Sequence, residues 1–152
     1  MADIFDELKK DHDRQRDMLR RLGEHPGDAA ACRKLFEAFR IDATAHAAAE
    51  EESLYAEMLG RPEMRDEGRH SVAEHKEIDD YFEELAESDF AGDAWQETFA
   101  KLRHRYEHHI DEEEEEIFAA AREGLSAERS DALAEKFRNR KPAEVAAVEA
   151  DG

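Results

Sequence analysis

An internal repeat with an offset of 63 residues constrains this chain more than any other feature. The segment HAAAEEESLY begins at His46, and the segment HIDEEEEEIF begins at His109 (109 − 46 = 63). In both, a glutamate follows the histidine after three residues. The segments DHDRQRDMLRRL from Asp11 and EHKEIDDYFEEL from Glu74 are related by the same offset (74 − 11 = 63). The repeat predicts two similar halves, each with an earlier and a later segment.

The spacing of apolar side chains predicts a helical protein. Only seven glycines and three prolines interrupt the 152 residues, so the elements are expected to be few and long. Four segments carry the helical period, and GEHPGD, GRP and SDFAGD separate them. Short loops between long helices make consecutive helices antiparallel. We therefore predict an all-α, up-down antiparallel four-helix bundle, with helices over residues 3–22, 28–59, 63–87 and 93–123.

The chain after the predicted bundle is expected to form a short fifth helix. Ser126 is a suitable N-cap, and this helix is predicted to end near Arg138. The residues after Pro142 are small and acidic, which is typical of a frayed terminus. The predicted organisation is a bundle over residues 1–124, followed by a short helix and a frayed tail over residues 125–152.

The apolar faces of the four helices contain six residues that are costly to bury. An unpaired buried polar group costs about 1–3 kcal/mol, so a set of six requires compensation. Each half of the repeat supplies one histidine from its earlier helix and a His-x-x-x-Glu motif from its later helix. The six residues are His12, His46, Glu50, His75, His109 and Glu113.

This set of side chains predicts a site for two metal ions. Residues four apart on a helix lie on the same face, about 5–6 Å from each other. His46 and Glu50 can therefore point at one centre, and so can His109 and Glu113. Imidazoles combined with carboxylates suit transition-metal ions, with iron favoured and manganese or zinc as alternatives.

The predicted ligands divide evenly between the two ions. Carboxylates inside helical bundles commonly bridge paired metals, so both glutamates are expected to span the two ions. A solvent-derived oxo or hydroxo bridge would give each ion about five ligands and leave one position open. The predicted ligand sets are His12 with His46 for one ion, His75 with His109 for the other, and Glu50 with Glu113 for both.

The pattern resembles the hemerythrin-like, or HHE cation-binding, domains over roughly residues 4–122. The likeness is carried by DH at Asp11, HAAAEE at His46, EHKEI around His75 and HIDEE at His109. The resemblance implies a four-helix bundle with a non-haem di-iron centre.

The chain departs at two places from the pattern of the oxygen-carrying hemerythrins. Those proteins have a second histidine one turn after the ligand of the third helix, where this chain has Asp79. They end with His-x-x-x-x-Asp, whereas here Glu113 and Glu114 lie four and five residues after the histidine. The chain is similar to a symmetrical four-histidine, two-glutamate variant, which disfavours simple reversible oxygen carriage.

Other histidines near these motifs have simpler interpretations. His104 and His108 have a spacing that can bind zinc. His108 is rotated by about 100° from His109 on a helix, so an exposed pair is favoured over a ligand pair. His70 lies off the face that carries His75 and is expected to be solvated.

Three residues close to the predicted ligands have two interpretations each. Tyr106 lies one turn before His109, and it is either a core aromatic or a residue that shapes access to the metals. Asp42 and Asp79 each lie one turn from a predicted ligand, and each is either exposed or hydrogen-bonded to the groups around the metals.

The charge of the chain limits its partners. A formal net charge of −19 repels nucleic-acid phosphates and anionic membrane surfaces. No apolar run approaches the roughly 18 residues of a membrane helix, and the N-terminus has no secretory signal pattern. A single cysteine fits a reducing compartment. We expect a cytoplasmic protein with no nucleic-acid or membrane partner. The sequence is compatible with a protein partner.

The expected function is a reaction of the di-iron centre with dioxygen or a reduced oxygen species. The ligand is then a small molecule: dioxygen, peroxide or nitric oxide. One class of function is an enzyme with catalase-like or peroxidase-like turnover. A second is a sensor or storage module that holds oxygen, nitric oxide or iron and acts through a partner. A third is an interaction protein whose fold is stabilised by its metals. Peroxide or oxygen chemistry is favoured, although the fold alone does not decide between these classes.

Overall fold

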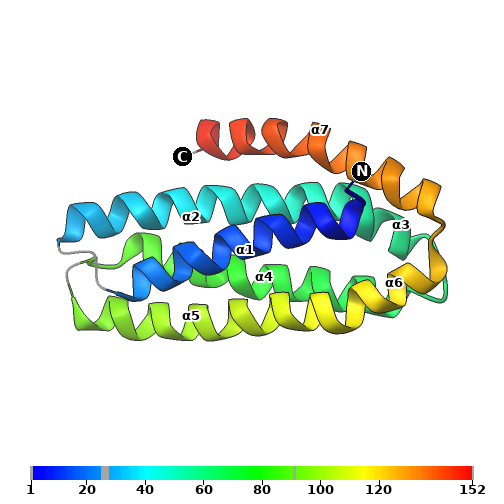
Figure 1. Cartoon of the computed structure of the whole chain (residues 1–152). Coiled ribbons are helices and arrows are strands. Elements are labelled where there is room, and N and C mark those ends of the chain that lie inside the picture. Colours follow the sequence, from blue (N-terminus) through cyan, green and yellow to red (C-terminus); the bar gives the residue numbers. More distant parts are fainter. Residues whose placement is uncertain (1, 25–27, 91, 152) are drawn as a thin grey trace.

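The long helices of a bundle lie side by side in antiparallel order, as Figure 1 shows. The structure is a computed structural model, and it describes residues 2–24, 28–90 and 92–151. Every regular element within these residues is a helix, so the predicted all-α bundle is confirmed. The four long helices of the bundle are α1 (Ile4–Gly23), α2 (Ala29–Glu50), α4 (Arg65–Glu87) and α5 (Asp93–Glu112). The remaining elements are η1 (Glu51–Tyr55), α3 (Ala56–Leu59), η2 (Glu113–Ile117), α6 (Phe118–Gly124) and α7 (Ala127–Asp151).

The ends of the four bundle helices agree with the sequence prediction to within two residues, if η1 and α3 continue α2 and if η2 and α6 continue α5. The carboxylate of Asp3 caps α1 by accepting a hydrogen bond from the backbone N–H of Asp6. Asp28 caps α2 in the same way. Such caps satisfy N–H groups that have no partner inside the helix. The predicted turn at residues 23–28 falls mainly on residues 25–27, which lie outside the described residues.

Each later helix of the repeat contains a five-residue π-helical segment that the sequence did not predict. The segment η1 directly follows Glu50, and the segment η2 begins with Glu113. A π-helical segment is a widened turn inside a helix, and it occurs frequently at functional sites. The two widened turns therefore lie within one residue of equivalent places in the repeat, next to the two glutamates of the predicted metal site.

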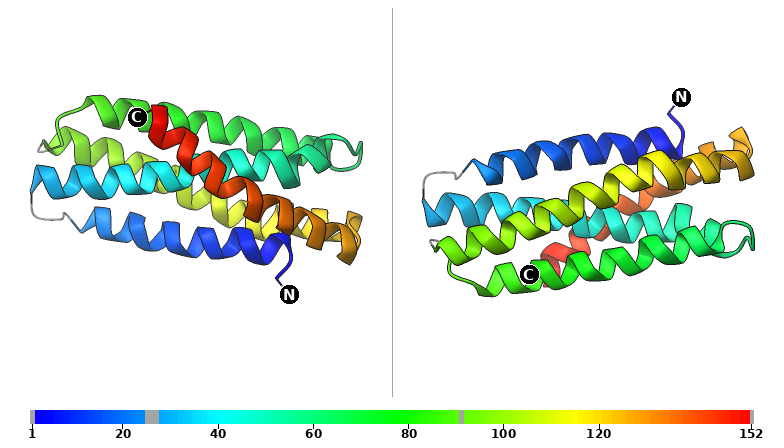
Figure 2. Two further views of the ribbon diagram at one scale, coloured as in Figure 1. Left: turned by 90° about the horizontal axis from the view of Figure 1, so that it is seen from above. Right: turned by 90° about the horizontal axis from the view of Figure 1, so that it is seen from below.

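The fifth helix is longer than predicted. The sequence predicted an end near Arg138 and a frayed tail after Pro142, but α7 continues to Asp151. Figure 2 shows α7 lying across α2 and α1. Its buried face includes Leu133 and Phe137, which join the apolar core. Beyond Arg138, Arg140 pairs with Glu52 and Lys141 pairs with Asp11, so tertiary contacts hold α7 to the bundle past the point that local sequence signals indicate. The division of the chain at residue 124 stays a prediction.

The apolar core consists of two clusters, one toward each end of the bundle. Burying a large apolar side chain contributes about 1.5–3 kcal/mol to the stability of the fold. These clusters therefore hold the helices together on either side of the polar residues in the middle of the bundle. The largest members toward the end that carries α3 and α6 are Phe5, Leu54, Tyr55, Met58, Phe118 and Phe137. The largest members at the other end are Phe36, Phe39, Phe82, Phe90, Trp95, Phe99 and Tyr106.

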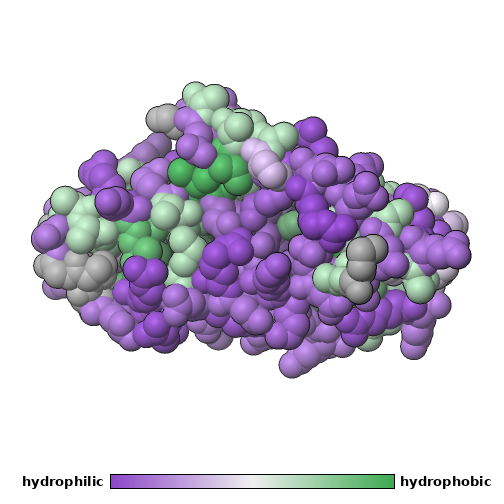
Figure 3. Space-filling model, turned by 45° about the horizontal axis from the view of Figure 1, so that its top comes forward, coloured by the Kyte–Doolittle hydropathy of each residue, from purple (hydrophilic) through white to green (hydrophobic). Residues whose placement is uncertain are grey.

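The surface of the molecule is mainly hydrophilic. Figure 3 shows charged and polar residues over most of one face, with small apolar areas between them. This agrees with the 41% of charged residues in the sequence. Within the described residues, no helix combines the length and the apolar character that crossing a membrane requires.

Candidate metal centre

The six residues singled out from the sequence meet in the middle of the bundle. Every one of them is buried, with at most 7% of its surface exposed. Their donor atoms form two groups in which all atoms lie within 4.8 Å of one another. One group consists of His12, His46, Glu50 and Glu113, and the other consists of His75, His109 and the same two glutamates.

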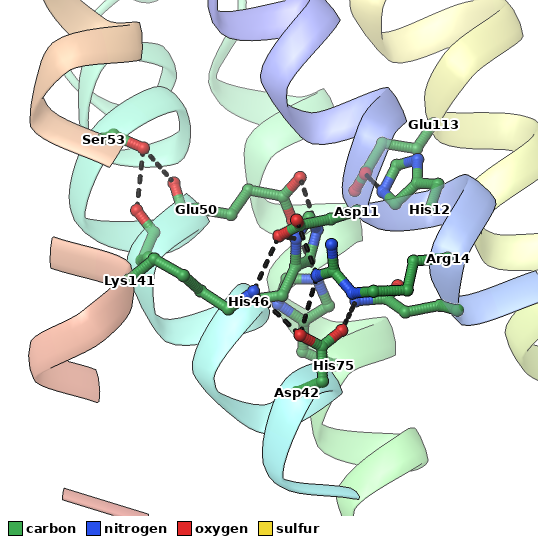
Figure 4. A network of polar contacts seen from close by, with 12 residues as sticks. Asp11, His12, Arg14, Asp42, His46, Glu50, Ser53, His75, Glu113 and Lys141 are labelled. Atoms are coloured by element: carbon green, nitrogen blue, oxygen red, sulfur yellow. Dashed lines mark hydrogen bonds and ion pairs between the residues drawn. The ribbon is translucent and has the colours of Figure 1, made fainter. Parts of the chain in front are cut away.

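The carboxylate of Glu50 lies between the two groups. Its Oε2 atom is 3.6 Å from Nε2 of His46 on the same helix. Its Oε1 atom is 3.3 Å from Nε2 of His75 on α4. Figure 4 shows this side chain extending from its helix toward the histidines. One carboxylate thus offers one oxygen to each group, which is the arrangement of a bridging ligand.

The carboxylate of Glu113 spans the groups in the same way from the opposite half. Its Oε1 atom is 2.9 Å from Nε2 of His12, and its Oε2 atom is 3.3 Å from Nε2 of His109. The hydroxyl of the buried Tyr55 donates a hydrogen bond to Oε2 of Glu113. This bond fixes the orientation of the carboxylate. Tyr55 itself is held in η1, the widened turn that follows Glu50.

A carboxylate faces the Nδ1 atom of each of the four histidines. An acceptor at Nδ1 holds the ring in the tautomer whose Nε2 lone pair points to the centre, and it orients the ring. The longest of the four contacts, at His75, lies outside hydrogen-bond geometry. The pairs are His12 with Glu114 at 2.7 Å, His46 with Asp11 at 2.8 Å, His109 with Glu74 at 2.9 Å and His75 with Glu51 at 3.5 Å.

Several buried atoms that face the centre have no hydrogen-bond partner within the described residues. Leaving such an atom unpaired costs about 1–3 kcal/mol, and more for a charged group. Imidazole nitrogens and carboxylate oxygens are atoms that a bound metal cation would satisfy. The donor set therefore fits bound metal ions. The unpaired atoms at the centre are Nε2 of His12, Nε2 of His46, both carboxylate oxygens of Glu50 and Oε1 of Glu113.

Comparison with known proteins places the chain in a family. The family model of the hemerythrin HHE cation binding domain matches residues 3–121. The chain belongs to this family. Membership implies that the domain binds a metal cation. The expected resemblance to the HHE domains is thereby confirmed.

A solved structure supports the same fold. It is that of a hemerythrin HHE cation binding domain-containing protein from Mycobacterium kansasii, and it superposes with a TM-score of 0.85. The match covers 97% of this chain and 90% of that chain, at 20% sequence identity. At this identity the likeness concerns the fold alone. A search among curated proteins found no match.

The buried carboxylates raise the pKa values of the histidines in this HHE domain. Burial by itself lowers the pKa of His46, but Glu50 and Asp11 outweigh it and raise that pKa to about 9. Burial is likewise outweighed at His109, mainly by Glu113, and its pKa rises to about 9. The pKa of His75 rises to about 10. In the metal-free domain, protonated imidazoles therefore balance the charge of the carboxylates.

Metal binding is expected to release protons, because a metal ligand must be a neutral imidazole. The raised pKa values mean that these histidines stabilise the metal-free fold below pH 6.5 and that this contribution is lost as the pH rises through about 9 to 10. Metal affinity should change in the opposite direction and rise with pH over the same range. A weakly buffered titration at pH 7 with an indicator dye measures the released protons. Binding without proton release, with an affinity that is flat from pH 6.5 to 9, would rule out these histidines as ligands.

A small cavity lies among the four histidines. Its volume is about 10 Å³, which is roughly the space for one water molecule. Tyr106 lines it and donates a hydrogen bond to Oε1 of Gln15 at 2.6 Å, so this tyrosine is both a core residue and part of the cavity wall. Asp79 also lines the cavity. Apolar side chains complete the wall: Ala43, Ala47, Ile78, Phe82 and Ile110.

The helix α7 reaches the centre through one lysine. Nζ of Lys141 lies 2.9 Å from Oδ2 of Asp11, the oxygen that also faces Nδ1 of His46. The same Nζ is 3.1 Å from Oδ1 of Asp42, so Asp42 is hydrogen-bonded to a group beside the centre, and it also accepts hydrogen bonds from Arg14 and Gln15. Figure 4 shows these side chains converging. The ring of Phe137 packs against His46 with 5.5 Å between ring centroids. These contacts of Phe137 and Lys141 were not predicted, because no local pattern in the sequence relates the fifth helix to residues of α1 and α2.

Sequence reasoning also missed residues that the repeat itself contains. Asp11 and Glu74 are related by the offset of 63 (74 − 11 = 63), and each faces a histidine of its own half. They directly precede His12 and His75, so their position next to a predicted ligand was a usable signal. Tyr55 carried a weaker signal, because its counterpart in the repeat is Phe118 (118 − 55 = 63), which has no hydroxyl group.

Proposed function

We propose that this HHE domain holds two iron ions and that the iron pair reacts with dioxygen or peroxide. The observation that carries the proposal is the pair of four-atom donor groups that share both glutamate carboxylates. The proposed ligands are His12, His46, Glu50, His75, His109 and Glu113. A solvent-derived bridge between the ions completes the proposed centre.

The donor chemistry favours iron over softer or harder ions. Each group offers two imidazole nitrogens and two carboxylate oxygens, a mixture that suits iron, manganese or zinc. Soft thiolate ligands are absent, because the one cysteine of the chain, Cys32, is buried in the core cluster toward the other end of α2. Calcium and magnesium prefer oxygen ligands alone, so the imidazoles disfavour them.

The size of the cavity supports a small ligand such as dioxygen or peroxide. A volume of about 10 Å³ admits one water-sized molecule and excludes organic substrates. Its apolar walls, including Ile78 and Phe82, keep competing water away from the centre. The bound iron pair would supply Lewis-acid and redox chemistry at this place. The protein would contribute the fixed carboxylates, the oriented imidazoles and the restricted access.

Peroxide disproportionation is the reaction that needs nothing beyond this centre. Two H₂O₂ molecules give one O₂ and two H₂O, so one peroxide is oxidised by two electrons and the other is reduced by two. Electrons and protons balance without an external reductant. We therefore place peroxide consumption ahead of a role as a sensor or store.

Oxygen release from peroxide tests this function. Iron-loaded protein should evolve about one O₂ for every two H₂O₂ consumed, as measured with an oxygen electrode. The zinc-loaded and metal-free forms are the controls, and both should be inactive because zinc has no redox chemistry. Equal rates in the iron and zinc forms would refute redox turnover. A spectral change with dioxygen or nitric oxide, without turnover, would favour the sensor or storage alternative.

Replacing one histidine in either group should lower metal occupancy. His12→Ala and His75→Ala each remove one of only two imidazoles from one ion, so we expect bound iron to fall from about two to about one per chain. Inductively coupled plasma mass spectrometry measures the iron. The control is His104→Ala, which changes an exposed histidine on α5 and should leave two ions bound. Full occupancy in both His12→Ala and His75→Ala would disprove the assignment.

A further inference from the structure

A second pair of His-x-x-x-Glu motifs faces across α4 and α5, outside the six proposed ligands. His70 and Glu74 form one motif on α4, and His108 and Glu112 form the other on α5. Residues four apart share one helix face, so each motif presents an imidazole and a carboxylate on the same side. The sequence predicted exposed histidines at both places, and both are about half-exposed. Their contact with a common carboxylate was not predicted.

The carboxylate of Glu112 lies between the two imidazoles. Its Oε1 atom is 2.6 Å from Nε2 of His70, and its Oε2 atom is 3.3 Å from Nε2 of His108. The carboxylate of Glu74 adds a third oxygen, because its Oε1 atom is 3.6 Å from Nε2 of His70. Donor atoms of His70, Glu74 and Glu112 all lie within 4.8 Å of one another. One imidazole and two carboxylates from two helices thus converge at the surface, and the imidazole of His108 lies beside this group, against Oε2 of Glu112.

The separations between these donors suit a tetrahedral metal ion. Donors at about 2.0–2.1 Å from a tetrahedral ion are roughly 3.3 Å from each other. The distance from His108 to Glu112 already has this value, and the distance from His70 to Glu74 is slightly longer. The shorter distance from His70 to Glu112 has to widen, which the half-exposed His70 side chain permits.

The surroundings of the cluster attract cations. A hollow of about 440 Å³ opens beside His70 and Glu112. Its described lining contains four carboxylates and one histidine and no lysine or arginine, and a hollow lined by one sign of charge raises the local concentration of the opposite ion. Arg105 pairs with Oε2 of Glu74 and with Glu77, so part of the Glu74 charge is already balanced. The hollow is lined by Asp66, Glu67, His70, Glu112, Glu116 and Ile117.

The geometry points to a third metal site, formed by His70, Glu74 and Glu112, that binds one divalent transition-metal ion. His108, which contacts the other oxygen of Glu112, is its fourth donor, at longer range. The mixed imidazole and carboxylate donors suit zinc, cobalt, nickel or ferrous iron, and they disfavour magnesium and calcium. The site does not depend on the proposed peroxide chemistry. It contacts the metal centre through Glu74, whose Oε1 atom also faces Nδ1 of His109 at 2.9 Å.

Cobalt binding to the iron-loaded protein tests the third site. Co²⁺ is titrated into protein from which loose iron has been removed, and bound cobalt is measured by visible absorption and by metal analysis. The wild type should bind one Co²⁺ more than the His70→Ala/His108→Ala double variant. Each single variant should bind that ion at least about tenfold more weakly than the wild type. Both side chains are half-exposed, so the substitutions should leave the fold intact, which circular dichroism checks.

The matched control is His104→Ala, which removes an exposed histidine one turn before His108 on α5. This variant should bind the additional cobalt as tightly as the wild type. Equal cobalt binding in the wild type and the double variant would overturn the third site, and so would an equal loss in His104→Ala. The experiment measures a difference of one bound cobalt ion between variants. Its result therefore does not depend on which metal occupies the central site.

Discussion

Glu113→Ala is expected to abolish the paired metal centre, whereas Glu114→Ala should preserve it. Glu113 gives one oxygen to each donor group, so its loss removes a ligand from both ions at once. It also leaves the buried hydroxyl of Tyr55 without its acceptor. Glu114 lies on the outer side of His12, at Nδ1, and pairs with Arg16. Its loss should weaken metal binding or activity by about 10–100-fold, but both metal ions should still bind.

Metal content together with the magnetic coupling of the two irons, seen by Mössbauer spectroscopy, separates these outcomes. Glu113→Ala should lose the coupled signal and the peroxide turnover, and Glu114→Ala should retain both. Glu50→Ala is the matched variant in the other half of the repeat, and it should behave like Glu113→Ala. The reverse result, with the centre intact in Glu113→Ala and lost in Glu114→Ala, would show that the site uses the five-residue spacing of the oxygen carriers. Reversible oxygen binding would then be the better interpretation.

Removing the metals should lower the melting temperature of the protein substantially. Ions that bind only the folded state stabilise it by about 4 kcal/mol at a free concentration of 1,000 times the dissociation constant. For a chain of this size, each kcal/mol corresponds to roughly 2–4 °C, so a loss of about 8–16 °C is expected. Two cations also offset part of the net charge of −19 and the burial of Glu50 and Glu113. Thermal melts with and without a chelator, followed by circular dichroism, measure the difference.

The His12→Ala/His75→Ala double variant is the control for chelation. It lacks one imidazole from each group, so its melting temperature should change little when chelator is added. The difference between the loaded and the metal-free wild type should grow from pH 6.5 to 9, because the metal-free form loses its imidazolium pairs as the pH rises. A metal-free wild type that melts at the same temperature as the loaded form would argue against a buried metal centre.

The sequence predicted the bundle and the meeting of the six residues because both follow from helical periodicity. The period of a helix places His46 and Glu50 on one face. The offset of 63 residues places His109 and Glu113 on the equivalent face of the later helix in the second half. Single glycines and prolines marked the turns between helices. These signals are local in the chain, so they are readable without knowledge of tertiary contacts.

Features that depend on tertiary packing were not predictable in the same way. The fifth helix was predicted to end near Arg138, yet beyond that point Arg140 pairs with Glu52 and Lys141 pairs with Asp11, and these contacts hold the longer α7 against the bundle. The π-helical segments carry no signature in composition, because their widened turns leave the residue types unchanged. Lys141 is 130 residues from Asp11 in the chain, so no local pattern connects them.

Anomalous X-ray diffraction at the iron absorption edge, on crystals of the iron-loaded protein, is the decisive test of the bridged di-iron centre. We expect two iron peaks in the middle of the bundle. One should lie within about 2.0–2.3 Å of the donor atoms of His12 and His46, and the other within the same distance of those of His75 and His109. Electron density for Glu50 and Glu113 should contact both peaks. A single peak, or two peaks without these carboxylates between them, would contradict a bridged di-iron centre.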